Sequence, residues 1–293
     1  MNLNSTENIH GILQGSTKLA TDASSGDSCR TELHNGTLYC VYVNNQQHIT
    51  YIMKPQYATW GTPIKLEPAT VSENTPTLVS FNGTLWLIHT NTAGNTVFSA
   101  WDESKATFIY VREKTFEISQ SASFAQVNDK LHMFYTLPTS SNIFSASTSD
   151  METWSKPVTI KKDGTHAILT NISPVAITYQ GLIHLIYKDK DGGFFLLKSD
   201  GEYWTSRIAL IGADYQHSPG ITVHNGLLKL VFTNFSSTPP FDLSQYSYDG
   251  SSLSPVVAST VLSAFNSPAL STQDGTLIAT FMEPPSTVEY LTD

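Results

Sequence analysis

Hydrophobic and polar residues are arranged along this chain in a unit that recurs six times. Each unit begins with Ser or Thr, often followed by Pro, and continues with two short apolar runs separated by two turn residues. Thr75–Thr90, "TPTLVSFNGTLWLIHT", and Ser173–Asp189, "SPVAITYQGLIHLIYKD", are two examples. Asn-Gly between two apolar runs is a strong β-hairpin signal, because both turn residues must tolerate a positive φ. The pattern therefore predicts six hairpins, which begin at Ser28, Thr75, Ser121, Ser173, Ser218 and Ser267.

The spacing of these units indicates how the hairpins are organised. Successive units begin 47, 46, 52, 45 and 49 residues apart. A period of about 40–50 residues with several strands per unit is typical of β-propeller blades. A third apolar run follows each hairpin, and a fourth run, often introduced by Trp, completes most units. The second unit matches least well, because no Trp introduces its fourth run.

The sixth unit stops after its third run, so its fourth strand has to come from another part of the chain. The segment Ile12–Ala20, "ILQGSTKLA", has a suitable length and pattern. Closing the ring in this way protects sheet edges that would otherwise promote aggregation. The sequence therefore predicts an all-β, six-bladed β-propeller with four antiparallel strands per blade, closed by an N-terminal strand that completes the last blade.

Length, composition and charge narrow the class of protein. The chain has 293 residues, 40% of them hydrophobic, and we expect residues 1–293 to form a single domain. A net charge of −9 argues against nucleic acid, which requires a basic surface. The sequence contains no long apolar run that would span a membrane and no Sec-type signal peptide. We expect a soluble monomer or small homo-oligomer, cytoplasmic or released by a non-classical route.

The cysteines and histidines give no sign of a disulfide, a metal or a cofactor. Cys29 and Cys40 flank the first hairpin as diagonal neighbours, about 7–8 Å apart, and are expected to be buried thiols. The nine His residues show no paired spacing typical of zinc sites. The segment Lys188–Gly193, "KDKDGG", lacks the later Glu of a calcium loop and is expected to form a polar turn.

Two stretches resemble a known turn motif. "SASTSDMETWSKP" (Ser145–Pro157) and "LKSDGEYWTSR" (Leu197–Arg207) resemble degenerate Asp-boxes of sialidase-type propellers, with Asp150 and Asp200 each four residues before a Trp. The wider layout also resembles the six-bladed fucose-binding lectins of fungi. That resemblance implies sugars bound between blades by an Arg, a Glu and an aromatic residue. No blade here carries the Arg–Glu pair, so the resemblance extends to the architecture.

Several residues have the chemistry of a sugar-binding site, in which an aromatic face stacks on the sugar and polar groups fix its hydroxyls. The alternative is that these residues pack one blade against the next. The candidate ligand-binding residues are Tyr39, Tyr51, Trp60, Trp86, His132, Ser145, Trp154, His184 and Trp204.

The loops that enter the first strands are a second candidate surface, because their amides can hydrogen-bond neutral hydroxylated ligands. The alternative is that loops favour Asn and Asp for turn formation. The polar residues of these loops are Asp27, Glu73, Asn74, Gln120, Asn171, Gln216, His217 and Asn266.

Three functions are compatible with this pattern. The first is a non-enzymatic, multivalent carbohydrate-binding propeller, either a lectin or the recognition module of a toxin or adhesion system, with glycans as partners. The second is a glycoside hydrolase or lyase with one axial site built on Asp27, Glu73 and Asp214, since glycosidases use paired carboxylates. The third is a protein-interaction scaffold, because propellers host all three functions.

Overall fold

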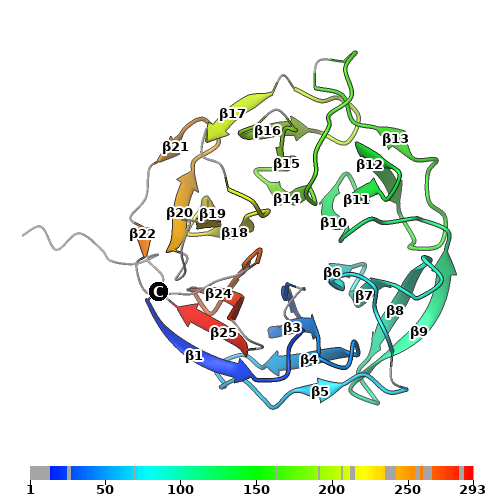
Figure 1. Cartoon of the computed structure of the whole chain (residues 1–293), viewed down its shortest axis with the longest axis vertical. Helices are drawn as coiled ribbons and strands as arrows, with labels where there is room; N and C mark the ends of the chain where they lie inside the picture. Colours follow the sequence, from blue (N-terminus) through cyan, green and yellow to red (C-terminus); the bar gives the residue numbers. More distant parts are fainter. Residues whose placement is uncertain are drawn as a thin grey trace, which may run out of the picture.

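The protein is a ring of six antiparallel sheets around a central axis (Figure 1). Five sheets have their strands in chain order from the axis outwards, the sixth takes its outermost strand from the N-terminal part of the chain, and the fifth has one additional short strand. The predicted six-bladed propeller is therefore confirmed. The computed structural model describes residues 14–24, 28–68, 70–162, 164–190, 192–205, 207–211, 215–234, 242–254, 258–259, 266–283 and 287–292.

The strands of the six blades occupy equivalent places. The first, innermost strands are β2 (Arg30–His34), β6 (Thr77–Phe81), β10 (Ser123–Val127), β14 (Val175–Tyr179), β18 (Gly220–His224) and β23 (Ala269–Gln273). The second strands are β3 (Thr37–Val43), β7 (Thr84–Thr90), β11 (Lys130–Leu137), β15 (Leu182–Lys188), β19 (Leu227–Asn234) and β24 (Thr276–Glu283). The third strands are β4 (Ile49–Lys54), β8 (Thr96–Asp102), β12 (Ser140–Thr148), β16 (Phe194–Ser199), β20 (Asp242–Tyr248) and β25 (Thr287–Thr292). The outer strands are β5 (Ile64–Lys65), β9 (Thr107–Lys114), β13 (Val158–Thr159), β17 (Ile208–Ile211), β21 (Leu253–Ser254) with β22 (Ala258–Ser259), and β1 (Gln14–Ala20).

The hairpin turns have the backbone conformation that the sequence predicts. Asn35 and Gly36 have φ values of 47° and 76°, and Asn225 and Gly226 have values of 50° and 74°. Residues without a positive-φ preference would strain these turns, which explains the recurrence of Asn, Asp and Gly. The turns fix the register, so that Thr31 pairs with Cys40 across the first hairpin as expected.

The ring is closed by the N-terminal strand. β1 pairs antiparallel with β25, with Thr17 opposite Tyr290, and it forms the outer strand of the sheet β1-β25-β24-β23. Figure 1 shows β1 and the C-terminus side by side. The predicted closing strand is therefore confirmed.

The outer strands differ from the prediction in where they begin. Trp154 was expected to open an outer strand, but it lies before β13, which starts at Val158. Pro157 has no N–H to donate, so the sheet pairing begins only after it. The second blade, which matched the pattern least well, has the longest of the described outer strands, β9, with eight residues.

Apolar clusters fill the spaces between neighbouring blades. One cluster joins the first and second blades through Tyr51, Leu87 and Trp101, and another joins the third and fourth through Phe134 and Leu185. Each of the six interfaces between neighbours has such a cluster. The hydrophobic core of this fold is therefore divided into wedges, each shared by two neighbouring blades.

The Ser and Thr residues that open the hairpins connect the blades around the axis. The backbone N–H of Ser28 donates to Thr75 Oγ1 at 3.2 Å, and the backbone N–H of Ser121 donates to Ser173 Oγ at 3.3 Å. Ser218 Oγ in turn donates to the carbonyl of Ser173 at 2.5 Å. The innermost strands have a free edge, so these hydroxyls satisfy backbone groups that the sheets leave unpaired.

The cysteines are buried and free, as the sequence predicts. Both are inaccessible to solvent, and Cys29 Sγ lies 3.4 Å from Thr280 Oγ1 of the last blade. Among the described residues no helix has the length and apolar character that a membrane span requires.

Candidate functional site

Three of the predicted ligand-binding residues are enclosed by protein. Tyr39, Tyr51 and His184 are at most 4% exposed. The Tyr51 hydroxyl donates to the carbonyl of Ala106 at 3.0 Å, and the ring of His184 packs on Tyr179 with 5.3 Å between ring centroids. A ligand would reach these side chains only if blades separated, so their part in binding stays a prediction.

The tryptophans follow one packing rule. Each of four indoles contacts an aromatic ring of the preceding blade, with ring centroids 5.1 to 5.9 Å apart. The pairs are Trp60 with Tyr290, Trp101 with Tyr39, Trp154 with Phe98, and Trp204 with Phe134. In the second blade this role belongs to Trp101, which lies within the third strand, and so no Trp introduces the fourth.

The remaining predicted residues also take part in this packing. Trp86 is half-buried against the cluster between the second and third blades. His132 is 7% exposed and stacks on Phe134, and Ser145 is equally buried in β12. The indole N–H groups of Trp60, Trp86 and Trp154 are buried without a hydrogen-bond partner in the described part of the chain. Burial lowers the pKa of His132, which favours a neutral imidazole.

The Asp-box-like stretches form tight turns. Asp150 Oδ1 accepts the backbone N–H groups of Glu152 and Thr153, each at 2.7 Å. Asp200 caps the same kind of turn in the fourth blade, and Asp249 does so in the fifth, where no Trp follows. These N–H groups lower the pKa of each carboxyl, because they stabilise its charged form. The motif is structural here.

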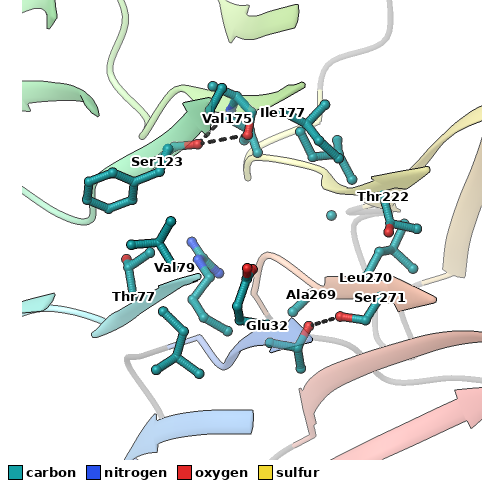
Figure 2. Close-up of a pocket in the computed structure, with 18 of the residues that line it drawn as sticks. Glu32, Thr77, Val79, Ser123, Val175, Ile177, Thr222, Ala269, Leu270 and Ser271 are labelled. Carbon is teal, nitrogen blue, oxygen red and sulfur yellow. Dashed lines mark hydrogen bonds between the residues drawn. The ribbon is translucent and has the colours of Figure 1, made fainter. Parts of the chain in front are cut away.

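A cavity of about 460 Å³ occupies the axis of the ring. The innermost strands of all six blades line it, and Figure 2 shows residues of these strands surrounding one open space. Its walls are mainly small aliphatic and hydroxyl side chains. The hydroxyl of Ser123 is engaged with the backbone of Ala176, whereas the hydroxyl of Thr222 has no partner among the described residues.

Two charged residues of the first blade line this cavity, Arg30 and Glu32. Glu32 Oε1 accepts the backbone N–H of Ser80 at 3.0 Å. Arg30 donates to the carbonyl of Cys29 at 3.0 Å and to Ser121 Oγ at 3.3 Å. Burial raises the pKa of Glu32 to about 7 and lowers that of Arg30, because it penalises the charged form of each.

Of the three carboxylates predicted for an axial enzyme site, the structure describes one, Glu73. Glu73 is exposed and does not line the axial cavity. Asp27 and Asp214 lie outside the described residues. The acid found in the cavity, Glu32, was not among the predicted residues. The sequence does contain a feature that could have identified Glu32. Arg30 and Glu32 are the only Lys, Arg, Asp or Glu residues in the six described innermost strands.

A second concave site lies between the third and fourth blades, and we call it the polar groove. It has a volume of about 300 Å³, at the lower end of typical ligand pockets. The entry loop of β10, the hairpin between β11 and β12, and the loop before β14 form its walls. Its lining residues are Ser119, Gln120, Thr136, Leu137, Pro138, Thr139, Ser140, Ser141, Thr170 and Asn171.

Hydrogen bonds fix the three walls of the polar groove relative to one another. The backbone N–H of Ser119 donates to the carbonyl of Thr136 at 2.8 Å, and that of Thr170 donates to the carbonyl of Ser141 at 2.9 Å. Gln120 Oε1 accepts both the backbone N–H and the hydroxyl of Ser173, each at 3.1 Å. The groove is therefore held in shape before any ligand enters.

Two amides of the polar groove are left available. The NH₂ group of Gln120 and the side chain of Asn171 have no hydrogen-bond partner in the described part of the chain, and both residues are exposed. The sequence predicted these two as loop amides but did not indicate that they share a groove. None of the lining residues is charged, so the site matches a neutral, hydroxylated ligand.

No cluster of potential metal ligands occurs among the described residues.

No protein-family model and no curated protein sequence matches the chain. Solved structures do match its fold. A variant of the Aleuria aurantia lectin in complex with Fucα1-6GlcNAc superposes with a TM-score of 0.71, at 9% identity over 93% of each chain. The SapL1 lectin in complex with α-methyl fucoside gives a TM-score of 0.68, at 10% identity over 94% of each chain.

The fold is also similar to that of an enzyme. A polysaccharide lyase, an ulvan lyase bound to a GlcA(1-4)Rha3S saccharide, gives a TM-score of 0.58, at 10% identity over 92% of this chain and 83% of the lyase. At identities this low, the similarities show a shared propeller fold. They do not show which residues of this chain form a binding site.

Proposed function

We propose that this protein is a non-enzymatic, carbohydrate-binding propeller that binds neutral sugars in the polar groove. The observation that carries the proposal is the lining of that groove, which presents hydroxyls, the free NH₂ group of Gln120 and the free amide of Asn171 without a charged side chain. Sugar hydroxyls are both donors and acceptors, and amides offer both functions in return. Fucose binding by the structural neighbours supports the same class of ligand.

Specificity in this site would come from Gln120 and Asn171. The Gln120 carbonyl is already used by Ser173, so its NH₂ group is oriented as a donor towards a ligand. Asn171 supplies a donor and an acceptor from the opposite wall. Leu137 and Pro138 provide the apolar surface on which the C–H face of a sugar would rest.

The test is a glycan array with the full chain, followed by calorimetry with each sugar that binds. Asn171→Ala should weaken binding about thirtyfold, because each lost hydrogen bond is worth about 1 kcal/mol and Asn171 would make two to the sugar. Gln56→Ala removes an exposed amide at the other end of the ring and should leave affinity unchanged. Unaltered binding by Asn171→Ala, or an array without a hit, would overturn the assignment.

Multivalent binding, as expected of a lectin, has a direct readout in the same calorimetric titration. A stoichiometry above one sugar per chain would support repeated sites that act together by avidity. A stoichiometry of one that Asn171→Ala abolishes would place all binding in the polar groove and would contradict multivalency.

A further inference from the structure

Two residues that line the axial cavity differ in charge from the residues at the equivalent positions of the other blades. At the place of Arg30 the other five innermost strands carry Thr77, Ser123, Val175, Gly220 and Ala269. At the place of Glu32 they carry Val79, Ala125, Ile177, Thr222 and Ser271. The other five blades therefore carry only neutral residues at these two positions, and the first blade carries a charged residue at both.

Both exceptional side chains face the same space. Arg30 and Glu32 are two residues apart on β2, so they lie on one face of the strand. Figure 2 shows the Glu32 carboxylate in the open space between the strands, opposite the hydroxyl of Thr222. No ion pair joins Arg30 or Glu32 to another described residue, although each makes hydrogen bonds with its neighbours.

Packing and capping do not require these charges. Glu32 caps the backbone N–H of Ser80 on the edge of the next blade. Elsewhere around the ring neutral hydroxyls do the same work, since Ser123 caps the N–H of Ala176 at 2.6 Å and Thr178 caps the N–H of Gln126 at 2.9 Å. Arg30 and Glu32 are half-buried, and even partial withdrawal of a charge from water without an ion-pair partner is costly, so an uncharged residue would stabilise the fold better.

We infer that the axial cavity binds a small polyhydroxylated anion, a sugar that carries a carboxylate or a sulfate group, with Arg30 contacting the anion. The guanidinium has five N–H donors, and two of them are used in the hydrogen bonds to Cys29 and Ser121. The remaining donors suit a planar or tetrahedral oxyanion. Glu32 and the hydroxyl of Thr222 lie where they would contact the hydroxyls of the same ligand.

This site is separate from the polar groove and does not depend on the proposed function. The two sites differ in charge as well as in place, because the groove has no charged lining residue and the cavity has two. Apart from Arg30 and Glu32, no lining residue of the cavity on β6, β10, β14, β18 or β23 is an acid or a base. Among the described residues, the Cys29 thiol also interacts electrostatically with Arg30. The charge of the cavity therefore depends chiefly on Glu32.

The experiment is calorimetry of the full chain with glucuronate, with inorganic sulfate and with glucose at about pH 6 and about pH 8. Glucuronate or sulfate should bind and glucose should not, and the anion should bind several-fold more tightly at the lower pH, where a neutral Glu32 leaves the Arg30 charge uncompensated. Binding of glucuronate without sulfate identifies a carboxylate as the anion, and the reverse identifies a sulfate. Absence of both overturns the inference.

Variants separate a binding role from a structural one. Arg30→Gln should weaken anion binding about tenfold or more, whereas Arg30→Lys should retain most of it. Lys18→Gln removes an exposed positive charge from the outer strand β1 and serves as the matched control. Glu32→Gln should abolish the pH dependence. Equal affinity of Arg30→Gln and the unmodified chain would overturn the inference, and Asn171→Ala should leave anion binding unchanged whether or not the groove binds sugars.

Discussion

Replacement of Glu32 by Gln tests the electrostatics of the axial cavity through protein stability. Burial raises the pKa of Glu32 from 4.5 to about 7, because the walls of the cavity disfavour its charged form. The folded chain therefore retains a proton that the unfolded chain releases at a lower pH. This contribution to stability is complete below about pH 4.5 and is lost as the pH rises through about 7.

The size of the effect follows from the two pKa values. Each pKa unit corresponds to about 1.4 kcal/mol, so full ionisation of Glu32 in the folded chain costs on the order of 3 kcal/mol. Gln cannot ionise, and its carbonyl oxygen can still accept the backbone N–H of Ser80. We expect Glu32→Gln to stabilise the protein by about that amount at pH 8 and by less than about 1 kcal/mol at pH 5.

Urea unfolding of both chains at the two pH values measures this difference. The slope with urea should stay the same, since neither state changes its exposed surface. Glu73→Gln is the matched control, because it makes the same chemical change at an exposed carboxylate and should have no pH-dependent effect. A stability difference for Glu32→Gln that is equal at pH 5 and pH 8 would refute the electrostatic account of the cavity.

Three further predictions concern the packing of the ring. Trp154→Ala should destabilise the protein by about 3 kcal/mol in urea unfolding. Trp154→Phe should cost clearly less, because the indole N–H has no partner to lose, and equal costs would contradict this account. A chain that begins at residue 21 lacks β1 and should aggregate in light-scattering measurements, since β25 then has a free edge; a monomer with an unchanged melting temperature would contradict the closure. Gly220→Ala should lower the melting temperature, with a cost of roughly 1–3 kcal/mol, because the new Cβ would lie 2.7 Å from the carbonyl oxygen of Pro268; an unchanged melting temperature would show that β18 and β23 can move apart.

The number of blades and their strand order could be predicted from the sequence because hairpins are local structures. Each turn, such as Asn35-Gly36, joins two strands that are adjacent in the chain, and its positive φ values leave a recognisable residue preference. The closing strand could be predicted by counting, because one blade lacked its fourth strand. The outer strands were located less accurately, since they are short and the prolines before them delay the sheet pairing.

The candidate sites could be predicted only in part. Gln120 and Asn171 were recognised as loop amides, but their shared groove depends on contacts between two blades. The aromatic residues were recognised as a repeated set, yet their burial depends on how closely neighbouring blades pack. Arg30 and Glu32 were not predicted as site residues, because the effect of two charges in the innermost strands depends on the axis that all six blades surround.

The sequence by itself determined the hairpins, their register and the need for a closing strand, because each of these depends on turn chemistry, on the alternation of side chains or on the count of strands. The tertiary structure alone decided what the ring encloses. Gln273 donates to the carbonyl of Gly36 across 237 positions of the chain, and Ser271 bonds Thr31 across 240. Contacts of this kind arise only when the ring closes, and so do the axial cavity and the polar groove, whose walls belong to different blades.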